Sequence, residues 1–406
     1  MRKWLKRLGF VVLGLVVLVA AVAIWKRDDL SRLMAVNSLF AEDRIVGNFS
    51  SMRSMFHSVD MDGGDPTPLP EGVPLALSDA ALPLDFDTWI QERHITGMVV
   101  LSGGAIVAEG YYLGTEQDDL RVSWSVAKSV LSLLVGQLHD EGVIPDLDAQ
   151  VTQFAPELRG SAYDGATIRN VLRMASGVAF NEDYFDFWSD INRMGRVLAL
   201  GGSMDGFAAG QSARRGAPGA DWQYVSIDTH VLGMVIRGAT GRSIADLVQE
   251  RLFRPLGLDR DPYYITDGRG VAFVLGGLNL TTRDYARIGQ LVAQNGEWQG
   301  QQIVSADWIA ESTAASAPGG VGYGYQWWLP DDATPGEVYA RGVYGQFIWI
   351  DRARDVVIAV NSADRAFRAE GVLDSNIAMF RAIARLAENT QDTPQVQQPQ
   401  ATEQTP

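Results

Sequence analysis

Cysteine is absent from this chain of 406 residues, and histidine occurs only four times. Without cysteine the protein has no disulfide, no zinc site with thiolate ligands and no cysteine nucleophile. The histidines are scattered, and none has the spacing of a metal-ligand motif such as H-E-x-x-H. The sequence therefore predicts no metal site, and nothing in it indicates a cofactor.

Positive charge is also scarce. The chain has 34 basic and 49 acidic residues, a net charge of -15 and a pI near 4.7. Nucleic-acid binding needs clustered Lys and Arg, so a nucleic-acid partner is excluded. With 47% hydrophobic and 20% charged residues, the composition predicts a folded body of one large domain or two lobes.

Lysine is the rarest of the basic residues, with four in the chain. Lys3, Lys6 and Lys26 flank an N-terminal apolar run, so Lys128 is the only lysine in the rest of the sequence. It follows Ser125 by one helical turn, which places amine and hydroxyl on one helix face. A desolvated lysine can lose its proton near neutral pH, whereas arginine cannot. The pair therefore indicates a serine nucleophile beside its base; the alternative is a surface lysine next to a helix-capping serine.

Residues 1–27 carry an uncharged run from Leu8 to Trp25. Its 18 residues span roughly 27 Å, close to the thickness of a bilayer core. We predict an uncleaved transmembrane anchor, with a signal peptide cleaved after Ala23 as the alternative. Because four basic residues precede the run and two follow it, the N-terminus should stay cytoplasmic and the catalytic domain should be exported, on the periplasmic or extracellular side.

The rest of the chain divides into three parts by composition. Residues 28–84 are expected to form an extended N-terminal region and linker, 85–388 a hydrolase domain, and 389–406 a disordered tail rich in Gln, Thr and Pro. Residues 201–221, rich in small side chains, are expected to form a long loop. The oligomeric state is not readable from the sequence.

Strand patterns occur at both ends of the predicted domain. Residues 97–112 and 347–360 each predict a hairpin, the first turning at 102–104 and the second at 351–355. Helical patterns lie between and after them, at residues 120–140, 167–177, 227–256, 283–293 and 373–387. This order predicts a two-lobed α/β fold, in which an antiparallel sheet flanked by helices is joined to a mainly helical lobe, with the Ser125 helix at the junction.

A proton carrier is also needed, and Tyr224, in the turn-like segment before a helix, is the first candidate. A phenol near a protonated lysine is expected to ionise below its usual pKa of about 10. Ser125-Val-Ala-Lys128, followed by Tyr224-Val-Ser226 and a glycine-rich strand start near the C-terminus, resembles the serine β-lactamase and penicillin-binding-protein superfamily, in its class C-like branch.

Four further segments look like the 6-aminohexanoate-dimer hydrolase group within that superfamily, and the resemblance covers roughly residues 85–385. These segments are 177–184, 284–289, 323–328 and 342–346.

The resemblance implies a role for each matching residue. Ser125 is the residue that becomes acylated, Lys128 activates it, and Tyr224 moves protons to the leaving group and from the attacking water. The backbone N–H groups of Ser125 and Val343 form the oxyanion hole. The implied substrate contacts are Tyr184, Ser226 and Gln346.

Two departures weaken a reading of the chain as a β-lactamase. Ser226 stands where class C enzymes carry Asn, and Ala340-Arg341-Gly342 replaces Lys-Thr-Gly. We therefore expect a serine hydrolase acting on amide or ester bonds of small molecules, with a β-lactamase or D-amino-acid peptidase as the alternative. A Ser-His-Asp hydrolase is disfavoured because no G-x-S-x-G segment occurs. A catalytically silent, membrane-tethered binding protein is the alternative of another class.

The segment Glu182 to Asp190 combines acidic and aromatic residues. With Asp205 it could cover the site with negative charge and favour neutral or amine-bearing substrates over carboxylated ones. The alternative is a solvated acidic face.

Overall fold

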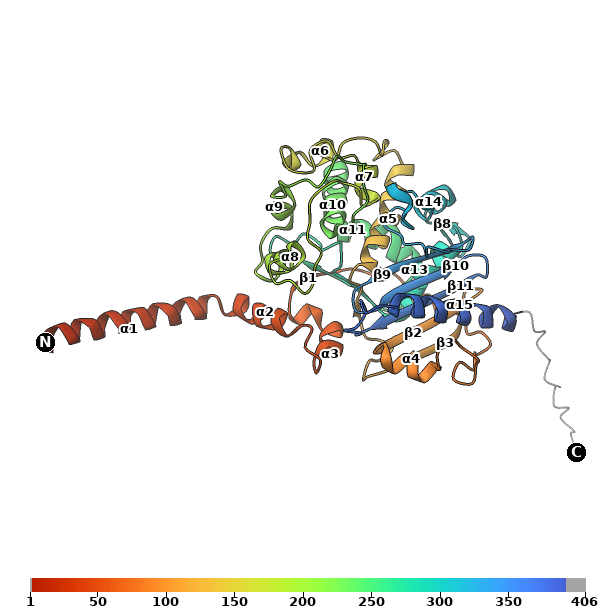
Figure 1. The fold of residues 1–406 in the computed structure, drawn as a ribbon, viewed down its shortest axis with the longest axis horizontal. Helices are drawn as coiled ribbons and strands as arrows, with labels where there is room; N and C mark the ends of the chain where they lie inside the picture. Colours follow the sequence, from red (N-terminus) through yellow and green to blue (C-terminus); the bar gives the residue numbers. More distant parts are fainter. Residues whose placement is uncertain (1, 392–406) are drawn as a thin grey trace, which may run out of the picture.

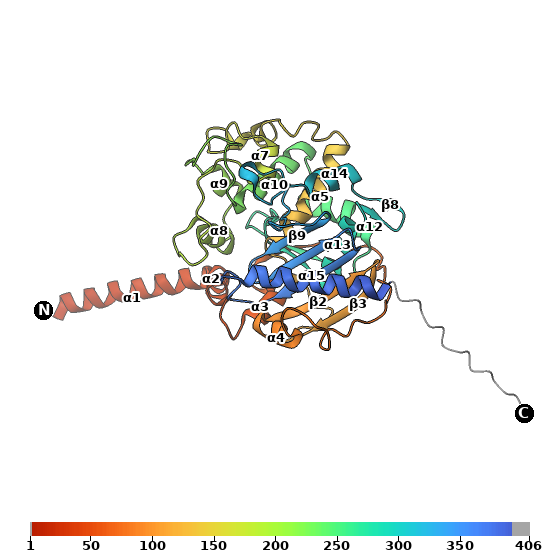
Figure 2. The same ribbon diagram turned by 45° about the vertical axis from the view of Figure 1, so that its right-hand side comes forward.

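The computed structural model describes residues 2–391, and its body is built on a five-stranded antiparallel sheet (Figures 1 and 2). The strands lie in the order β3 (Ala105–Tyr111), β2 (Ile95–Ser102), β11 (Val356–Ser362), β10 (Gln346–Asp351) and β9 (Glu337–Gly342). The sheet thus joins the two ends of the domain, because β2 pairs with β11. Both predicted hairpins are confirmed, as β2 with β3 and β10 with β11.

Helices cover both faces of this sheet. α4 (Phe86–Glu92) and α15 (Val372–Gln391) pack on one face, where the core includes Val100. α13 (Thr282–Ala293) and α5 (Val126–Asp140) pack on the other. Successive strand residues point to opposite faces, and β2, β10 and β11 are buried at every position because helices cover both faces. This layered arrangement confirms the predicted α/β class.

The second lobe is mainly helical and lies above the sheet in Figure 1. α10 (Ser226–Thr240) runs through it beside α5, with shorter helices around them. These are α6 (Val151–Phe154), α7 (Ile168–Leu172), α8 (Asp190–Ala199), α9 (Met204–Ala209), α11 (Ile244–Val248), α12 (Arg254–Leu256) and α14 (Ala306–Ser312).

Three predicted helices differ from the observed ones. The helix expected over 167–177 is shorter, because α7 ends at Leu172. The helix expected from residue 120 begins at Val126, because Arg121 and Val122 form strand β4 and pair with β6 (Leu278–Leu280). The helix expected over 227–256 is broken at Gly241, which adopts a left-handed conformation with φ of 67° and ends α10. The pairing of β4 with β6 depends on tertiary contacts, whereas Gly241 is a local helix stop that the sequence already contains.

Smaller sheets complete the fold. β4 and β6 belong to a four-stranded sheet with β5 (Tyr263–Thr266) and β1 (His57–Asp60), in the order β1-β5-β6-β4. A separate hairpin pairs β7 (Glu297–Trp298) with β8 (Gln301–Gln302). The four-stranded sheet was not predicted, because its strands are short and far apart in sequence.

The region after residue 27 is packed rather than extended. It contains α2 (Arg27–Ser38) and α3 (Ile45–Ser50), and the side chains of Leu39 and Phe49 are buried in the main core. Arg121 fixes α3 to the body by donating to Val46 O at 2.7 Å and to Ser50 Oγ at 2.6 Å. The expectation of an extended region is therefore wrong for this part of the chain.

The N-terminal helix projects from the body in Figures 1 and 2. α1 (Arg2–Trp25) is exposed, and its stretch from Lys6 to Trp25 is long and apolar enough to cross a membrane, a property that a signal sequence shares. At the other end α15 continues to Gln391, and residues 392–406 of the predicted tail lie outside the described residues.

A chain beginning at Arg27 tests this arrangement. Since the apolar stretch of α1 is not buried against the body, we expect the truncated protein to keep the melting temperature of the full chain but to leave the membrane fraction. Calorimetry and cell fractionation measure the two effects. If expression of the untruncated sequence instead yields a soluble protein that begins after Ala23, α1 is a cleaved signal.

Candidate active site

Ser125 and Lys128 meet at the start of α5, where the two lobes join. Lys128 Nζ lies 2.8 Å from Ser125 Oγ. Ser125 occupies the N-cap position of α5, yet its side chain makes no capping hydrogen bond, and the side chain of Lys128 is buried. The alternative of a capping serine beside a surface lysine is therefore wrong, and the hydroxyl is available to the amine.

Burial changes the acidity of Lys128. The loss of water around the amine lowers its pKa to about 7, while the carboxylates of Glu182 and Asp228 act in the opposite direction. Lys128 Nζ also lies 2.9 Å from Leu275 O and 3.3 Å from Ser226 Oγ. A large share of Lys128 is thus neutral at physiological pH and able to accept a proton.

Tyr224 lies on the other side of the nucleophile. Its phenol hydrogen-bonds with Ser125, and its ring stacks on Trp328 with centroids 5.3 Å apart. Burial raises the pKa of Tyr224 above its usual value, helped by the nearby carboxylate of Glu182. The expectation that this phenol ionises below pH 10 is wrong, because desolvation outweighs the positive charges around it. Tyr224 is a neutral phenol and so a proton donor.

Trp124 precedes the nucleophile in a conformation that few residues adopt. Its φ is 42°, in the left-handed region that disfavours any residue with a Cβ atom. The ring packs against Phe40 and Phe49 at centroid distances of 5.7 and 5.5 Å, and Phe40 stacks on Tyr344 at 4.7 Å. We call Phe40, Phe49, Trp124 and Tyr344 the aromatic cluster. It joins the N-terminal region to the two loops that flank the site.

Val343 follows β9 and lies beside the nucleophile. The preceding Gly342 allows this approach, because a Cβ atom there would stand 2.6 Å from Ser123 O. The N–H of Ser125 is among the first in α5, where backbone donors have no partner within the helix. The arrangement thus agrees with the oxyanion hole predicted from Ser125 and Val343, which stays a prediction.

A cavity of about 180 Å³ opens at Ser125, and we call it the polar cavity because three charged side chains contribute to its lining. Its lining residues are Ser125, Glu182, Tyr184, Tyr224, Trp328, Arg341, Gly342, Val343, Phe367 and Arg368.

Glu182 is the acidic group of this polar cavity. Its Oε1 accepts a hydrogen bond from the backbone N–H of Ser226, while burial raises the pKa of its carboxyl. Tyr184 hydrogen-bonds with Ser226, so both predicted substrate contacts lie at the cavity wall or just behind it.

The charge of the polar cavity differs from the expected negative cover. Arg341 and Arg368 line the same cavity as Glu182, and Arg368 lies over the ring of Tyr184 at 4.7 Å. Asp205 points elsewhere, since it pairs with His230 at 2.7 Å and with Arg237 at 2.6 Å. The site therefore presents both signs of charge.

Gln346 does not reach the cavity. Its side chain is buried, donates to Ser362 O at 2.7 Å and accepts from Asn361 Nδ2 at 3.1 Å. It also contacts the carbonyls of Val343 and Tyr344. The predicted substrate contact is wrong, and Gln346 instead supports the turn that carries Val343.

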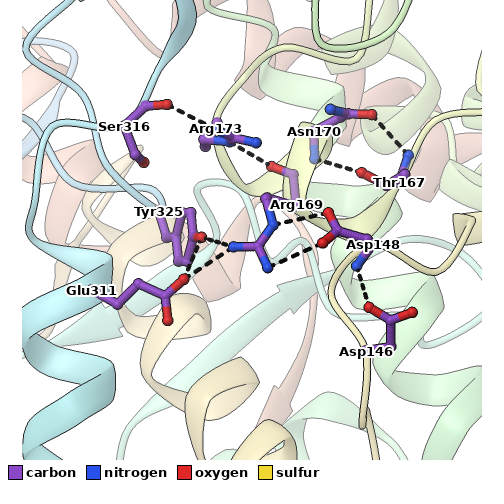
Figure 3. Close-up of polar contacts among 9 residues, drawn as sticks. All are labelled: Asp146, Asp148, Thr167, Arg169, Asn170, Arg173, Glu311, Ser316 and Tyr325. Atoms are coloured by element: carbon purple, nitrogen blue, oxygen red, sulfur yellow. Dashed lines mark hydrogen bonds and ion pairs between the residues drawn. The ribbon is translucent and has the colours of Figure 1, made fainter.

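A charged network behind the site fixes the wall that carries Trp328. Arg169 of α7 donates to Asp148 Oδ1 at 2.9 Å and to Glu311 Oε1 at 3.0 Å, as Figure 3 shows. The hydroxyl of Tyr325 donates to the same Glu311 oxygen at 2.7 Å. These contacts tie the helical lobe to α14 and to the segment that continues to Trp328.

Neither a metal cluster nor a Ser-His-Asp triad accounts for this site. Within residues 2–391, no three His, Asp or Glu side chains gather as metal ligands. His230 is buried and paired with Asp205, away from the cavity at Ser125.

Comparison with known proteins agrees with this geometry. The beta-lactamase family model matches residues 85–378. The chain belongs to the beta-lactamase family.

Among relatives of this beta-lactamase family member, the 6-aminohexanoate-dimer hydrolase of Paenarthrobacter ureafaciens is 32% identical over 329 residues, covering 76% of this chain and 83% of that protein. Esterase EstB of Burkholderia gladioli is 30% identical, over 47% of this chain and 53% of its own. A solved structure titled as a putative 6-aminohexanoate-dimer hydrolase from Bacillus anthracis shares the fold, with a TM-score of 0.78 at 24% identity over 86% of this chain and 96% of that one. The expected superfamily and its hydrolase character are thereby confirmed.

The sequence did not indicate two parts of the site. Arg368 lies in a turn-rich segment without a motif, and the aromatic cluster joins residues some 300 positions apart. The left-handed residue before the nucleophile gives no sequence signal either. Glu182 was anticipated as one member of an acidic segment, and it lines the polar cavity.

The buried amine predicts a specific pH dependence. Because the neutral form of Lys128 accepts the proton, kcat/KM should rise with pH through an apparent pKa of about 7 and level off above it. Glu182→Gln should move this limb to lower pH, since the removed carboxylate raises the pKa of Lys128.

Lys128→Arg should lose about 10²- to 10⁴-fold in rate, because a guanidinium cannot accept the proton of Ser125. Wild-type turnover in Lys128→Arg would exclude the base role.

Phe49→Ala tests the aromatic cluster. Removing this buried ring should lower the melting temperature because it leaves a cavity in the core. It should also reduce kcat about 10- to 100-fold, because Trp124 loses its packing partner next to the nucleophile. Phe380→Ala is the matched control, since that ring is equally buried on the far face of the sheet. Equal kcat values for the two variants, measured well below both melting temperatures, would contradict a positioning role.

Proposed function

We propose that this protein hydrolyses amide or ester bonds of small molecules through an acyl-enzyme on Ser125. The observation that carries this proposal is the buried Lys128 amine, 2.8 Å from Ser125 Oγ with its pKa lowered to about 7. A neutral lysine beside a serine hydroxyl can take up its proton when the serine attacks the carbonyl of a bound substrate.

In the first half of the reaction, Ser125 Oγ attacks the carbonyl carbon while Lys128 takes the hydroxyl proton. The negative charge on the carbonyl oxygen is stabilised by the backbone N–H groups of Ser125 and Val343. Tyr224, a neutral phenol within hydrogen-bond reach of Ser125, donates its proton to the departing amine or alcohol and regains one from Lys128. The acyl group stays on Ser125 as an ester.

In the second half, water attacks this ester. Its proton passes to Lys128, directly or through Tyr224, and Ser125 leaves the carbonyl carbon with a proton returned from the same pair. The acid product departs and the starting enzyme is restored. Apart from the attacking water, no group outside the chain is needed for the balance of this step.

The polar cavity supports a polar leaving group. Arg341 and Arg368 can pair with a carboxylate, whereas Glu182 can accept from an amide or ammonium group. We therefore propose leaving groups with both kinds of polar function, in place of a preference for amines alone. Arg341, in place of the Lys-Thr-Gly lysine, also favours a second candidate, the hydrolysis of carboxylated β-lactams or D-amino-acid peptides.

We propose that α1 holds this hydrolase at a membrane with the body exported, which the fractionation of the truncated chain tests. The support is the exposed apolar stretch from Lys6 to Trp25.

Intact-mass measurement tests the reaction. The protein is incubated with p-nitrophenyl acetate, an ω-amino amide with a carboxylate in its leaving group, and a penicillin. We expect acyl adducts that are absent in Ser125→Ala and that form from the ester faster than from penicillin, while the amide shows whether a charged acyl group is accepted as well. Faster acylation by penicillin would favour the β-lactamase alternative, and no adduct or turnover with any substrate would favour a silent binding protein.

A further inference from the structure

A second cavity, of about 350 Å³, also opens at Ser125 and is lined mainly by apolar side chains. We call it the apolar cavity. It lies between α2, α8 and the loop before β6, and its apolar lining includes Leu39, Phe40, Phe56, Ile191, Leu198 and Phe273. Its size falls in the range of pockets that hold small organic ligands, roughly 300 to 1,000 Å³.

The polar and apolar cavities meet at the nucleophile. Ser125, Tyr184 and Val343 line both of them. A substrate whose carbonyl sits at Ser125 therefore extends into the polar cavity on one side and the apolar cavity on the other. The two halves of such a substrate differ in chemistry.

The proton donor decides which half is which. Tyr224, which protonates the leaving group, lines the polar cavity and is not among the residues of the apolar one. The leaving group thus occupies the polar side, together with Arg341. The acyl group, which remains on Ser125, is left with the apolar side.

We propose that the apolar cavity binds a linear alkyl chain on the acyl part of the substrate, so that this hydrolase prefers medium-chain acyl esters or amides with a polar leaving group. This inference rests on the proposed acyl-enzyme at Ser125.

The lining of the apolar cavity has few charged groups, which suits an uncharged acyl chain. Arg196 is the one charged residue in its lining within the described chain, and its guanidinium donates to Phe187 O at 2.7 Å and lies 4.2 Å from the Phe187 ring. That contact holds the guanidinium at the loop before α8. No carboxylate lines the apolar cavity, so a charged acyl group would lose water without gaining a partner of opposite sign.

The rim of the apolar cavity adds exposed aromatic surface. Phe185 and Phe187 line it and are 75% and 56% exposed. α8 and α2 contact each other, and in Figure 1 they lie on the side of the body from which α1 extends. An alkyl chain longer than the cavity can therefore continue along apolar side chains at its mouth.

Two substrate series test the assignment. For p-nitrophenyl esters from acetyl to decanoyl, kcat/KM should rise about fourfold per methylene until the cavity is full. Ethyl octanoate should react faster than octyl acetate, its constitutional isomer of equal apolar content. A flat chain-length series, or faster hydrolysis of octyl acetate, would overturn the proposal.

Gly195 offers a variant that fills the apolar cavity. It lines the cavity within α8, and a Cβ atom there meets no heavy atom within 4 Å. Gly195→Phe should reduce the ratio of kcat/KM for the octanoyl ester to kcat/KM for the acetyl ester by at least about tenfold. A few methylenes bound in an apolar pocket contribute a discrimination of this size. Gly47→Phe is the matched control, because Gly47 is also an unobstructed helical glycine but lies outside the cavity. An unchanged ratio in Gly195→Phe would contradict the assignment.

Binding to Ser125→Ala separates this proposal from the proposed reaction. Calorimetric titration with octanoate should show binding that Gly195→Phe weakens in the same background and that Gly47→Phe leaves unchanged. If octanoate binds in this way but no ester or amide is turned over, the hydrolase proposal fails, whereas the assignment of the apolar cavity to an alkyl chain stands. If acetyl esters acylate Ser125 but octanoate does not bind, the assignment of the apolar cavity to an alkyl chain fails, whereas the hydrolase proposal stands.

Discussion

The desolvated amine of Lys128 is the constraint on which the site depends. A lysine surrounded by water keeps its proton at neutral pH and cannot activate a serine. Burial at the junction of the lobes lowers the pKa of this amine, while Glu182 and Asp228 keep that pKa from falling further. The fold therefore has to hold two lobes tightly around one polar atom. Ser226 and the carbonyl of Leu275 supply the remaining contacts, so the amine is buried with hydrogen-bond partners.

The same burial assigns different tasks to Lys128 and Tyr224. Desolvation penalises the charged form of each group, which lowers the pKa of an amine and raises that of a phenol. One environment thus yields a base and an acid at neutral pH on either side of Ser125. The opposite assignment, with an ionised phenol and a protonated lysine, would require strong positive charge nearby, and the cavity contains Glu182 as well as its two arginines.

The N-terminal region contributes to the site from outside the family domain. Phe40 and Phe49 precede residue 85, where the family match begins, yet they pack on Trp124 and Tyr344 next to the nucleophile and Val343. Phe40 also lines the apolar cavity. The segment that leads from the apolar N-terminal helix to the body is thus part of the site wall. Its removal would affect both the strained loop at Trp124 and the space for an acyl chain.

The local elements of the fold were largely predictable. Short apolar runs separated by a turn segment, 102–104 in one case and 351–355 in the other, identified both hairpins, because a strand pattern and a turn are properties of neighbouring residues. The four-stranded sheet was missed because β1 and β4 are short and pair with strands over a hundred residues away. The packed helices after residue 27 were missed for a similar reason, since tertiary burial decides their stability.

For the site, the sequence by itself determined Ser125, Lys128 and Tyr224 as candidates, because helical spacing and the scarcity of lysine are visible in the residues alone. It could not determine their charge states, since a pKa depends on water and charges brought close by distant segments. The tertiary structure therefore decided that Tyr224 is neutral, that Gln346 supports a turn, and that Arg341 and Arg368 line one cavity with Glu182. It also decided that two cavities of different polarity meet at Ser125, because their walls come from segments that only folding brings together.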